Sequence, residues 1–216
     1  MLSVANLSIE YQNKTVVDGL TLELAQGEIF ALLGDSGSGK SSTLRFIAGL
    51  DNTKQGSVEL DGVRLSDHGQ HIVAPESREV GMVFQDYALF PHMSVFKNVS
   101  FGINHLPKSD QKKRVSELLS MVGLQGSEDK YPHQLSGGEQ QRVSLIRALA
   151  PAPKILLMDE PFSSLDVNHR QQLTLQVRQI LKETNTTSIL VTHDRDEANT
   201  LADRVGKIKH KQLTLV

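Results

Sequence analysis

The sequence of 216 residues is long enough to bury the core of one large domain, and 38% of its residues are hydrophobic. Its 23 Lys and Arg residues against 25 Asp and Glu residues give a formal net charge of −2, which argues against a strongly basic nucleic-acid-binding protein. The absence of cysteine excludes disulfides and thiolate metal sites. No apolar run approaches the ~20 residues that a membrane-spanning helix needs, and residues 1–6 lack the charged and apolar regions of a signal peptide.

The first part of the chain predicts half-exposed β-strands. Apolar and polar residues alternate over residues 2–10 and 20–24, which is the period of a strand with one buried face. Asp18-Gly19 is a turn signal between these two segments. Further on, residues 57–60 followed by Asp61-Gly62 are typical of one arm of a β-hairpin. The pattern therefore predicts short strands joined by tight turns.

A phosphate-binding motif lies between two apolar segments. The run Gly34-Asp35-Ser36-Gly37-Ser38-Gly39-Lys40-Ser41 fits the pattern G-x-x-x-x-G-K-[ST]. Residues 29–33 before it predict a buried strand, and residues 42–48 after it predict the first turns of a helix. In this context the glycines let backbone N–H groups converge on phosphate oxygens, while Lys40 supplies a positive charge and Ser41 a ligand for Mg²⁺. An ordinary Gly/Ser loop is the alternative, but it does not require the strand and helix on either side.

The middle of the chain changes to a helical pattern. Residues 80–84 predict another buried strand, which ends at Gln85, and the pattern becomes helical from about residue 87 to 150. Apolar residues at helical spacing predict a helix over residues 110–122 with Ser109 as its N-cap. Its three consecutive basic residues, 112–114, fit a solvated helix face better than a nucleic-acid site. A second helix is expected to begin near residue 136 and to end at about Ala150, before Pro151.

Two further apolar runs end in candidate catalytic residues. Residues 155–158 predict a buried strand followed by Asp159 and Glu160, and residues 188–192 predict another that ends at His193. Because ligands of parallel sheets bind at the carboxyl ends of the strands, these side chains are expected beside the phosphate-binding loop. Asp159 is then a candidate Mg²⁺ ligand and Glu160 a candidate general base for an attacking water. The alternative for the carboxylates is an acidic turn that only ends a strand.

A second motif indicates the family. Leu135-Ser136-Gly137-Gly138-Glu139-Gln140-Gln141-Arg142 matches the signature sequence of ATP-binding cassette (ABC) ATPases, and with the phosphate loop upstream the chain resembles the nucleotide-binding subunit of an ABC transporter. The resemblance covers nearly the whole chain. It implies an α/β fold of the P-loop NTPase type, with a central mostly parallel sheet, an antiparallel β-subdomain and an inserted helical subdomain at about residues 87–150. We expect a single domain over residues 1–216 without a C-terminal regulatory domain, although related importers commonly continue into one.

The resemblance also implies roles for individual residues, with ATP and Mg²⁺ as cofactors. Tyr11 is expected to stack on adenine, and Ser136 and Gly138 to contact ATP bound to a second subunit. Residues 163–166 match a loop that communicates across the dimer. The other expected nucleotide contacts come from Gly34, Asp35, Ser36, Gly37, Ser38, Gly39, Lys40, Ser41 and Ser42. The expected metal ligands are Ser41, Gln85 and Asp159, and the expected catalytic residues are Glu160, His193, Gln85 and Lys40.

The expected partners follow from the same resemblance. They are a second ABC subunit, most simply an identical one with ATP at the interface, an integral membrane permease contacted through residues 85–95, and an extracytoplasmic solute-binding protein. No nucleic-acid partner is expected. The expected location is the cytoplasmic face of the inner membrane, reached through the permease. The blocks at residues 82–92 and 160–166 look like bacterial importer ATPases for ferric iron, polyamines, sulfate or sugars, with iron and polyamine types most similar. The alternatives are a non-transport ABC ATPase acting on DNA or ribosomes, and an exporter cassette.

Overall fold

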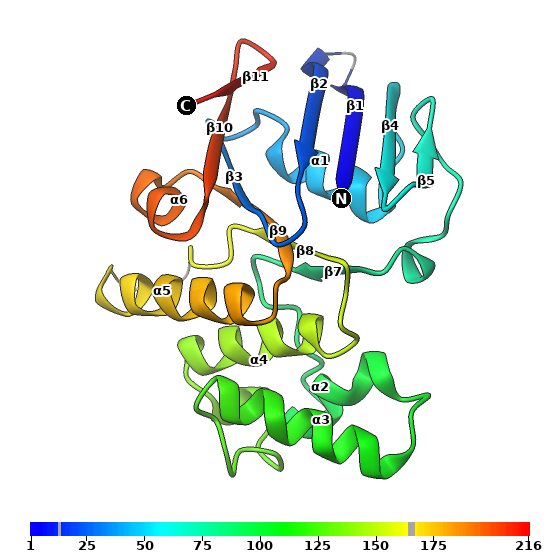
Figure 1. Ribbon diagram of the computed structural model, residues 1–216. Helices are drawn as coiled ribbons and strands as arrows, with labels where there is room; N and C mark the ends of the chain where they lie inside the picture. Colours follow the sequence, from blue (N-terminus) through cyan, green and yellow to red (C-terminus); the bar gives the residue numbers. More distant parts are fainter. Residues whose placement is uncertain (13, 164–166) are drawn as a thin grey trace.

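Two β-sheets and a group of helices make up the chain in a computed structural model that describes residues 1–12, 14–163 and 167–216 (Figure 1). The smaller sheet lies at one end of the molecule and a helical region lies at the other, with the larger sheet between them. Helix α1 (Lys40–Ala48) contacts both sheets. The arrangement confirms the predicted α/β fold of the P-loop NTPase type.

The smaller sheet is antiparallel, and buried residues alternate with more exposed ones along β1 and β4. Its spatial order is β2 (Lys14–Leu24), β1 (Leu2–Tyr11), β4 (Gln55–Leu60), β5 (Val63–Asp67) and β6 (Gln70–His71). The predicted hairpin turn at Asp61-Gly62 joins β4 to β5. The predicted turn at Asp18-Gly19 is wrong, because these residues lie inside β2 and Gly19 has a φ of +64° where the pairing with β1 shifts register. There the glycine allows an irregularity within a strand, which is a second common use of its conformational freedom.

The larger sheet is parallel except at one edge. Its spatial order is β11 (Gln212–Leu215), β10 (Arg204–Lys209), β3 (Ile29–Leu33), β9 (Thr187–Thr192), β8 (Ile155–Asp159) and β7 (Val80–Val83), with only β11 antiparallel to its neighbour. All five residues of β3 are buried, because both faces of the sheet are covered. Ile29 and Ala31 face one hydrophobic cluster while Phe30 and Leu32 face the other, as the two-residue period of a strand requires. The buried strands predicted at residues 29–33, 155–158 and 188–192 are confirmed. The strand predicted at residues 80–84 ends at Val83, and of its residues only Val83 is fully buried, because β7 lies at an edge of the sheet.

A buried arginine joins the smaller sheet to α1. The guanidinium of Arg78 donates hydrogen bonds to the carbonyl oxygens of Phe46 and Ile47 in the last turn of α1, at 3.3 and 2.9 Å. It also donates to the carbonyl oxygen of Leu65 and the hydroxyl of Ser66 in β5, at 3.1 and 3.0 Å. Only 1% of Arg78 is exposed, so this charge is offset almost entirely by protein oxygen atoms. The contact fixes the end of the helix that follows the phosphate loop.

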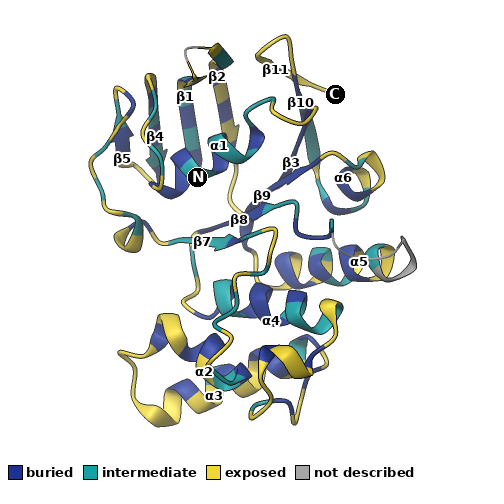
Figure 2. Ribbon diagram, turned by 180° about the vertical axis from the view of Figure 1, so that it is seen from behind, coloured by how far each residue is buried: buried dark blue, intermediate teal, exposed yellow. Residues whose placement is uncertain are grey.

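Helices form the opposite end of the molecule. They are α2 (Val95–Ser100), α3 (Lys108–Met121) and α4 (Gly137–Leu149), with short 3₁₀ turns at Pro75–Ser77, Phe101–Ile103 and Pro132–Gln134 elsewhere in the chain. Buried residues line the inner faces of these helices, while much of α3 is exposed (Figure 2). The predicted burial of Val115, Leu118, Leu119 and Val122 is confirmed.

Two local predictions in this region are wrong. Residues 87–94 form no helix, and α2 begins only at Val95. Ser109 does not cap α3, because the helix already begins at Lys108, after Pro107. The Ser109 hydroxyl instead donates to the carboxylate of Asp110 at 3.1 Å. Proline is tolerated at the start of a helix, because a backbone N–H there would have no partner within the helix, so the missing donor costs nothing.

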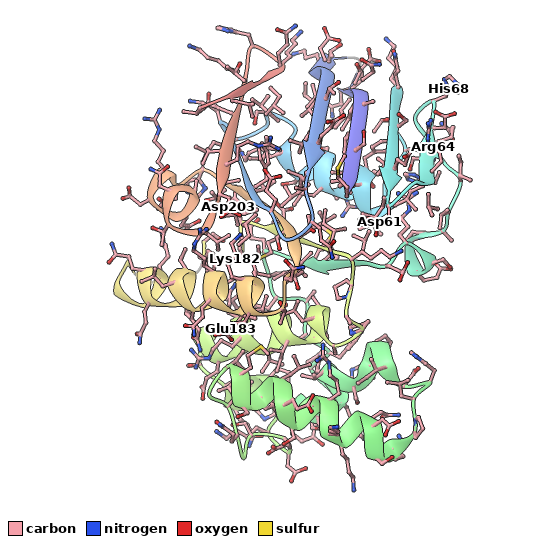
Figure 3. All side chains as sticks on the ribbon, in the orientation of Figure 1. Asp61, Arg64, His68, Lys182, Glu183 and Asp203 are labelled. Carbon is pink, nitrogen blue, oxygen red and sulfur yellow. The ribbon has the colours of Figure 1, made fainter. Side chains whose placement is uncertain are left out.

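Helices α5 (Val167–Glu183) and α6 (Arg195–Leu201) pack beside the larger sheet. Asp203 anchors the start of β3 by accepting a hydrogen bond from the Ile29 N–H at 2.9 Å, and its carboxylate also pairs with Lys182 and Arg178 of α5 (Figure 3). Among the described residues, the helices are too short or too polar for any of them to cross a membrane. The larger sheet is thereby held between helices on both sides, with its strand ends open for a ligand.

Candidate active site

The phosphate-binding loop connects β3 to α1. Gly37 and Gly39 have φ values of +77° and +92°, which side chains rarely adopt. At Gly39 a Cβ atom would also lie 2.4 Å from a methyl carbon of Val17, so the loop leaves no room for a side chain there. Helix α1 begins immediately afterwards at Lys40, and its first N–H groups have no partner within the helix. The loop therefore has the backbone form that the motif predicts.

Lys40 is held inside this loop. Its ammonium donates to the carbonyl oxygens of Gly34 and Asp35, at 2.8 and 3.0 Å, and only 5% of the residue is exposed. An ammonium group has three donors, so these two contacts leave one for another acceptor. The two contacts orient the charge within the loop.

The loop lines a cavity of about 460 Å³. Its lining residues are Val16, Ser36, Gly37, Ser38, Gly39, Lys40, Ser41, Ser42, Gln85 and Glu160. The hydroxyl oxygen of Ser38 is buried and has no hydrogen-bond partner among the described residues. A buried hydroxyl without a partner costs free energy, and a phosphate oxygen supplies the missing acceptor. The loop thus fits a phosphate group, and the cavity brings Gln85 and Glu160 to it from two other strands.

Asp159 ends β8 next to the first turn of α1. The Ser41 hydroxyl donates to the Asp159 carboxylate at 2.8 Å. Burial raises the pKa of Asp159, the Ser41 hydrogen bond partly opposes this, and the neighbouring Glu160 charge raises the pKa further. A carboxylate of this kind gains from a nearby cation. Among the described residues, no group of three or more His, Cys, Asp or Glu side chains is arranged to hold a metal ion.

Glu160 and His193 meet at the ends of β8 and β9. The Nδ1 atom of His193 lies 3.3 Å from a carboxylate oxygen of Glu160. The backbone of Glu160 has a φ of +43°, and its N–H donates to the carbonyl oxygen of Val191 at 2.9 Å. Its carbonyl oxygen also accepts from the hydroxyl and N–H of Ser163, at 3.0 and 3.2 Å. These bonds hold Glu160 in a left-handed conformation that costs of order 1 kcal/mol. In this conformation the Glu160 carboxylate lines the cavity and lies beside His193.

A polar cluster behind His193 was not predicted from the sequence. Glu197 is only 6% exposed and accepts a hydrogen bond of 2.6 Å from the Thr192 hydroxyl. Arg170 of α5 pairs with Asp194 at 3.1 Å and with Glu197 at 3.6 Å. Asp194 caps α6 by accepting from the N–H groups of Asp196 and Glu197. The acidic residues after His193 are the sequence signal for the cap, but nothing near them indicates that Arg170 is the partner.

A second cavity, of about 450 Å³, adjoins the first and shares Ser36 and Glu160 with it. Its lining residues are Leu33, Gly34, Asp35, Ser36, Glu160, His193, Arg195 and Lys207. Arg195 and Lys207 were not predicted as site residues. Lys207 could have been found only from the pairing of β10 with β3, which sets it beside Leu33 at the entry to the loop.

Two predicted residues of the signature sequence lie apart from these cavities. Ser136 is the N-cap of α4, where its hydroxyl accepts from the Glu139 N–H at 3.3 Å and the Glu139 carboxylate accepts from the Ser136 N–H at 2.7 Å. This reciprocal cap lowers the pKa of Glu139. Neither Ser136 nor Gly138 lines either cavity. Tyr11 ends β1, but its side chain and residues 164–166 of the predicted dimer loop lie outside the described part.

Comparison with known proteins gives the class that this site defines. Residues 17–163 match the family model described as ABC transporter, which covers the phosphate loop, the signature sequence and both carboxylates. The chain therefore belongs to the ABC transporter family, as its ATPase domain. The predicted resemblance is confirmed.

Particular relatives narrow the class. The chain is 46% identical over 208 residues to the putrescine transport ATP-binding protein PotG of Escherichia coli (strain K12), covering 95% of this chain and 54% of PotG. It is 47% identical to the sulfate/thiosulfate import ATP-binding protein CysA of Nocardia farcinica, covering 95% of this chain and 61% of CysA. It is 43% identical to the Fe(3+) ions import ATP-binding protein FbpC of Photorhabdus laumondii subsp. laumondii, covering 94% of this chain and 57% of FbpC. The chain thus spans little more than half the length of these curated relatives.

A solved structure matches the whole chain. The ATP-binding cassette MJ0796, solved as a dimer in a post-hydrolysis state bound to ADP and Pi, superimposes with a TM-score of 0.84 and 28% identity. The match covers 99% of this chain and 96% of that chain. The sheet order and inserted helices described above are therefore those of an ABC ATPase domain.

Proposed function

We propose that this chain binds and hydrolyses ATP as the motor subunit of an ABC importer. One observation carries the chemical part of the proposal. The phosphate-binding loop, Gln85 and Glu160 line one cavity, and His193 contacts Glu160 at its edge. These groups come from the ends of four neighbouring segments of one sheet, where α/β proteins bind their ligands.

Each group has a role in phosphoryl transfer. The loop N–H groups, Lys40 and the Ser38 hydroxyl are assigned to the phosphate oxygens of ATP. Ser41, Asp159 and Gln85 would hold Mg²⁺, which when bound supplies charge neutralisation at the β- and γ-phosphates. Gly34, Asp35, Ser36 and Ser42 complete the loop around the triphosphate, and Tyr11 is assigned to the adenine ring.

Glu160 and His193 are assigned to the attacking water. Glu160 accepts its proton as general base. His193 Nδ1 lies 3.3 Å from the Glu160 carboxylate, and His193 is assigned to orienting that carboxylate, with Nε2 left for the water or the phosphate.

A second copy of the chain completes the site. Ser136 and Gly138 stand at the N-terminus of α4, away from both cavities of their own chain. A helix N-terminus presents N–H groups to anions, so in a head-to-tail dimer these residues close over ATP bound to the partner. The dimeric form of MJ0796 supports this arrangement.

The relatives indicate the cargo class and the other partners. Their names give putrescine as a transported solute, and sulfate or thiosulfate and Fe(3+) as imported solutes. On this basis the chain works with an integral membrane permease at the cytoplasmic face of the inner membrane, and with an extracytoplasmic solute-binding protein. Residues 85–95 are assigned to the permease contact. Among the cargoes we favour ferric iron or a polyamine.

The test of the chemistry is Glu160→Gln. Removing the general base should lower the ATPase rate by about 10²–10⁴-fold, while ATP binding is retained and an ATP-dependent dimer accumulates in size-exclusion chromatography. Glu183→Gln is the control, because Glu183 lies on the exposed surface of α5 (Figure 3) and should leave the rate unchanged. A parental ATPase rate in Glu160→Gln would remove Glu160 from its assigned role.

A further inference from the structure

Residues 86–94, called the connecting loop below, run from the strand that leads to Gln85 to the start of α2. Tyr87 and Ala88 follow one another in the left-handed region, with φ values of +61° and +47°. Residues other than glycine rarely adopt this conformation, and two in succession persist only where surrounding groups hold them. The connecting loop therefore depends on contacts made by other parts of the chain.

Those contacts come from the helix that begins at the signature sequence. The Ser144 hydroxyl in α4 donates to the carbonyl oxygen of Tyr87 at 2.9 Å. One turn further along, Arg147 donates to the carbonyl oxygens of Ala88 and Tyr87, at 2.6 and 3.2 Å. The guanidinium carbon of Arg147 also lies 5.5 Å from the centre of the Phe90 ring, within the range of a cation–π contact. Both left-handed residues are thus bound to α4 through their carbonyl groups.

A second side chain holds the far end of the connecting loop. Asn98 of α2 is fully buried, and its amide oxygen accepts from the Phe90 N–H at 2.9 Å. Its amide nitrogen donates to the carbonyl oxygens of Phe90, Met93 and Ser94, at 3.1, 3.0 and 3.1 Å. Because α2 packs on α4, this end is joined to the same group of helices.

The guanidinium of Arg147 makes its hydrogen bonds to the connecting loop. Burial lowers the pKa of the Arg147 guanidinium, and the nearby Asp86 charge partly opposes that effect. No ion pair within 4.0 Å joins Arg147 to a described carboxylate, so backbone carbonyls are its principal partners in the part of the chain that the structure covers. A planar guanidinium can donate to two carbonyls at once, which a lysine ammonium on one stem does less well.

We propose that Arg147 and Ser144 are positioning residues that fasten the connecting loop to α4. The connecting loop, which lies within the segment assigned to the permease contact, then moves as one rigid body with α4, the helix that bears Ser136 and Gly138. The proposal rests on the function proposed above, since it concerns how a permease contact reaches the ATP site.

The same contacts show where the helical body, which contains the connecting loop and α4, joins the larger sheet. Gln85 and Asp86 are exposed and precede the first residue bound to α4, so one crossing to the sheet lies there. At the other crossing, Arg114 of α3 donates to the carbonyl oxygens of Leu149 and Ala150 at the end of α4, at 3.0 and 3.3 Å. The return to β8 therefore lies in residues 151–154, where the Lys154 N–H already bonds to Glu79 near β7. The helical body is thus joined to the larger sheet through two short segments.

Hydrogen exchange in the nucleotide-free protein tests the fastening. Arg147→Met keeps the length of the stem and removes the donors, so amide exchange within residues 87–93 should rise at least about tenfold. Ser144→Ala should give a smaller rise, and Arg147→Lys should fall between the parent and Arg147→Met. Arg114→Met is the matched control, because it also removes a guanidinium bound to two carbonyls but does not touch the connecting loop. Parental exchange in Arg147→Met would overturn the proposal.

A second experiment tests the coupled motion. The chain has no cysteine, so paired cysteines can carry spin labels at His92 in the connecting loop, at Gln134 before α4 and at Lys54 near the smaller sheet. In the Glu160→Gln background, ATP with Mg²⁺ should change the 54–92 distance while the 92–134 distance stays constant. Arg147→Met should broaden the 92–134 distances. If ATP changes no distance in the Glu160→Gln protein, the proposed function fails, whereas a 92–134 distance that changes with ATP in the protein retaining Arg147 overturns only the fastening.

Discussion

The carboxyl group of Asp159 illustrates a conflict between stability and chemistry at a single residue. It is partly buried, accepts one hydrogen bond from Ser41 and lies next to a second carboxylate, Glu160. Burial raises the pKa of Asp159, so ionisation at neutral pH costs folding free energy in the metal-free protein. Binding of a cation beside Asp159 would offset this free-energy cost of ionisation.

Asp159→Asn should therefore make the nucleotide-free protein more stable. The substitution keeps an acceptor for Ser41 and removes the charge, and a gain below about 1 kcal/mol raises Tm by about 2 °C in a domain of this size. The pH dependence has a definite sign. The cost of the ionised group is fully present above the folded-state pKa and disappears as the pH falls toward the unfolded value of 3.8, so the two proteins should converge in acid. Calorimetry across pH measures this, and a lower Tm for Asp159→Asn at pH 7 would contradict it.

Residues of the site differ in how far sequence could predict them. Lys40, Ser41 and Asp159 were assigned from two short motifs at the ends of β3 and β8, and the structure joins Ser41 to Asp159 by a hydrogen bond across the intervening β9. Arg78 and Arg147 were not singled out, because their partners are backbone carbonyls distant in the sequence. A carbonyl group belongs to every residue, so no residue type marks it as the partner of a particular arginine.

At the scale of elements, the end of α1 is fixed by Arg78. Helices leave their last carbonyl groups without partners, and here a side chain from outside the helix binds two of them while also binding β5. The helix that begins at the phosphate loop is thus attached to the smaller sheet at its other end. Removal of that attachment affects two elements together.

Arg78→Met should lower the free energy of unfolding by about 3 kcal/mol, because it leaves several buried acceptors without a donor. Urea unfolding followed by circular dichroism gives the value. Arg64→Met is the control, since Arg64 lies on the exposed surface of the same sheet (Figure 3) and its ion-pair partners among the described residues are Glu59 and Asp67. Loss of these exposed pairs should cost less than about 0.5 kcal/mol. Equal losses of unfolding free energy in the two variants would mean that the buried hydrogen bonds of Arg78 stabilise the fold no more than the exposed ion pairs of Arg64 do.

Element boundaries were predicted less well than element types. The strand and helix runs were found from their periods, but Asp18-Gly19 was taken as a turn, although the two residues lie inside β2. The glycine of an Asp-Gly pair can adopt a positive φ, and that conformation occurs both in turns and in strand irregularities. The helical pattern was also started too early, at residue 87, because a loop held by Ser144, Arg147 and Asn98 carries as many apolar residues as a helix.

At the scale of the whole molecule, the two halves of the proposed site lie on different parts of the fold. The phosphate loop is attached to the larger sheet, whereas Ser136 and Gly138 belong to the helical end. In the head-to-tail dimer proposed above, each site would therefore form from the loop of one copy and α4 of the other.

Mixing two inactive variants tests this division. Lys40→Ala disables the loop and Gly138→Asp sets a charge at the N-terminus of α4, so each protein alone should be nearly inactive. In a 1:1 mixture half of the dimers are mixed, and each mixed dimer has one intact site of two, so the ATPase rate should recover to about a quarter of the parent rate. Dilution below the dimerisation range should abolish the recovery. No recovery, with both proteins folded and dimeric, would mean that the two motifs serve the same chain.

Strands β7 and β8 are neighbours in the larger sheet, yet residues 84–154 separate them in the sequence. The entropy of closing a long loop grows only with the logarithm of its length, so an excursion of this size adds little to the cost of pairing the two strands. The segment leaves and returns at adjacent points, and it carries both the connecting loop and α4. Replacement of residues 84–154 by the corresponding segment of another importer ATPase would therefore exchange the proposed permease contact together with Gln85, Ser136 and Gly138. The phosphate loop and the ends of β8 and β9 would stay in place on the larger sheet.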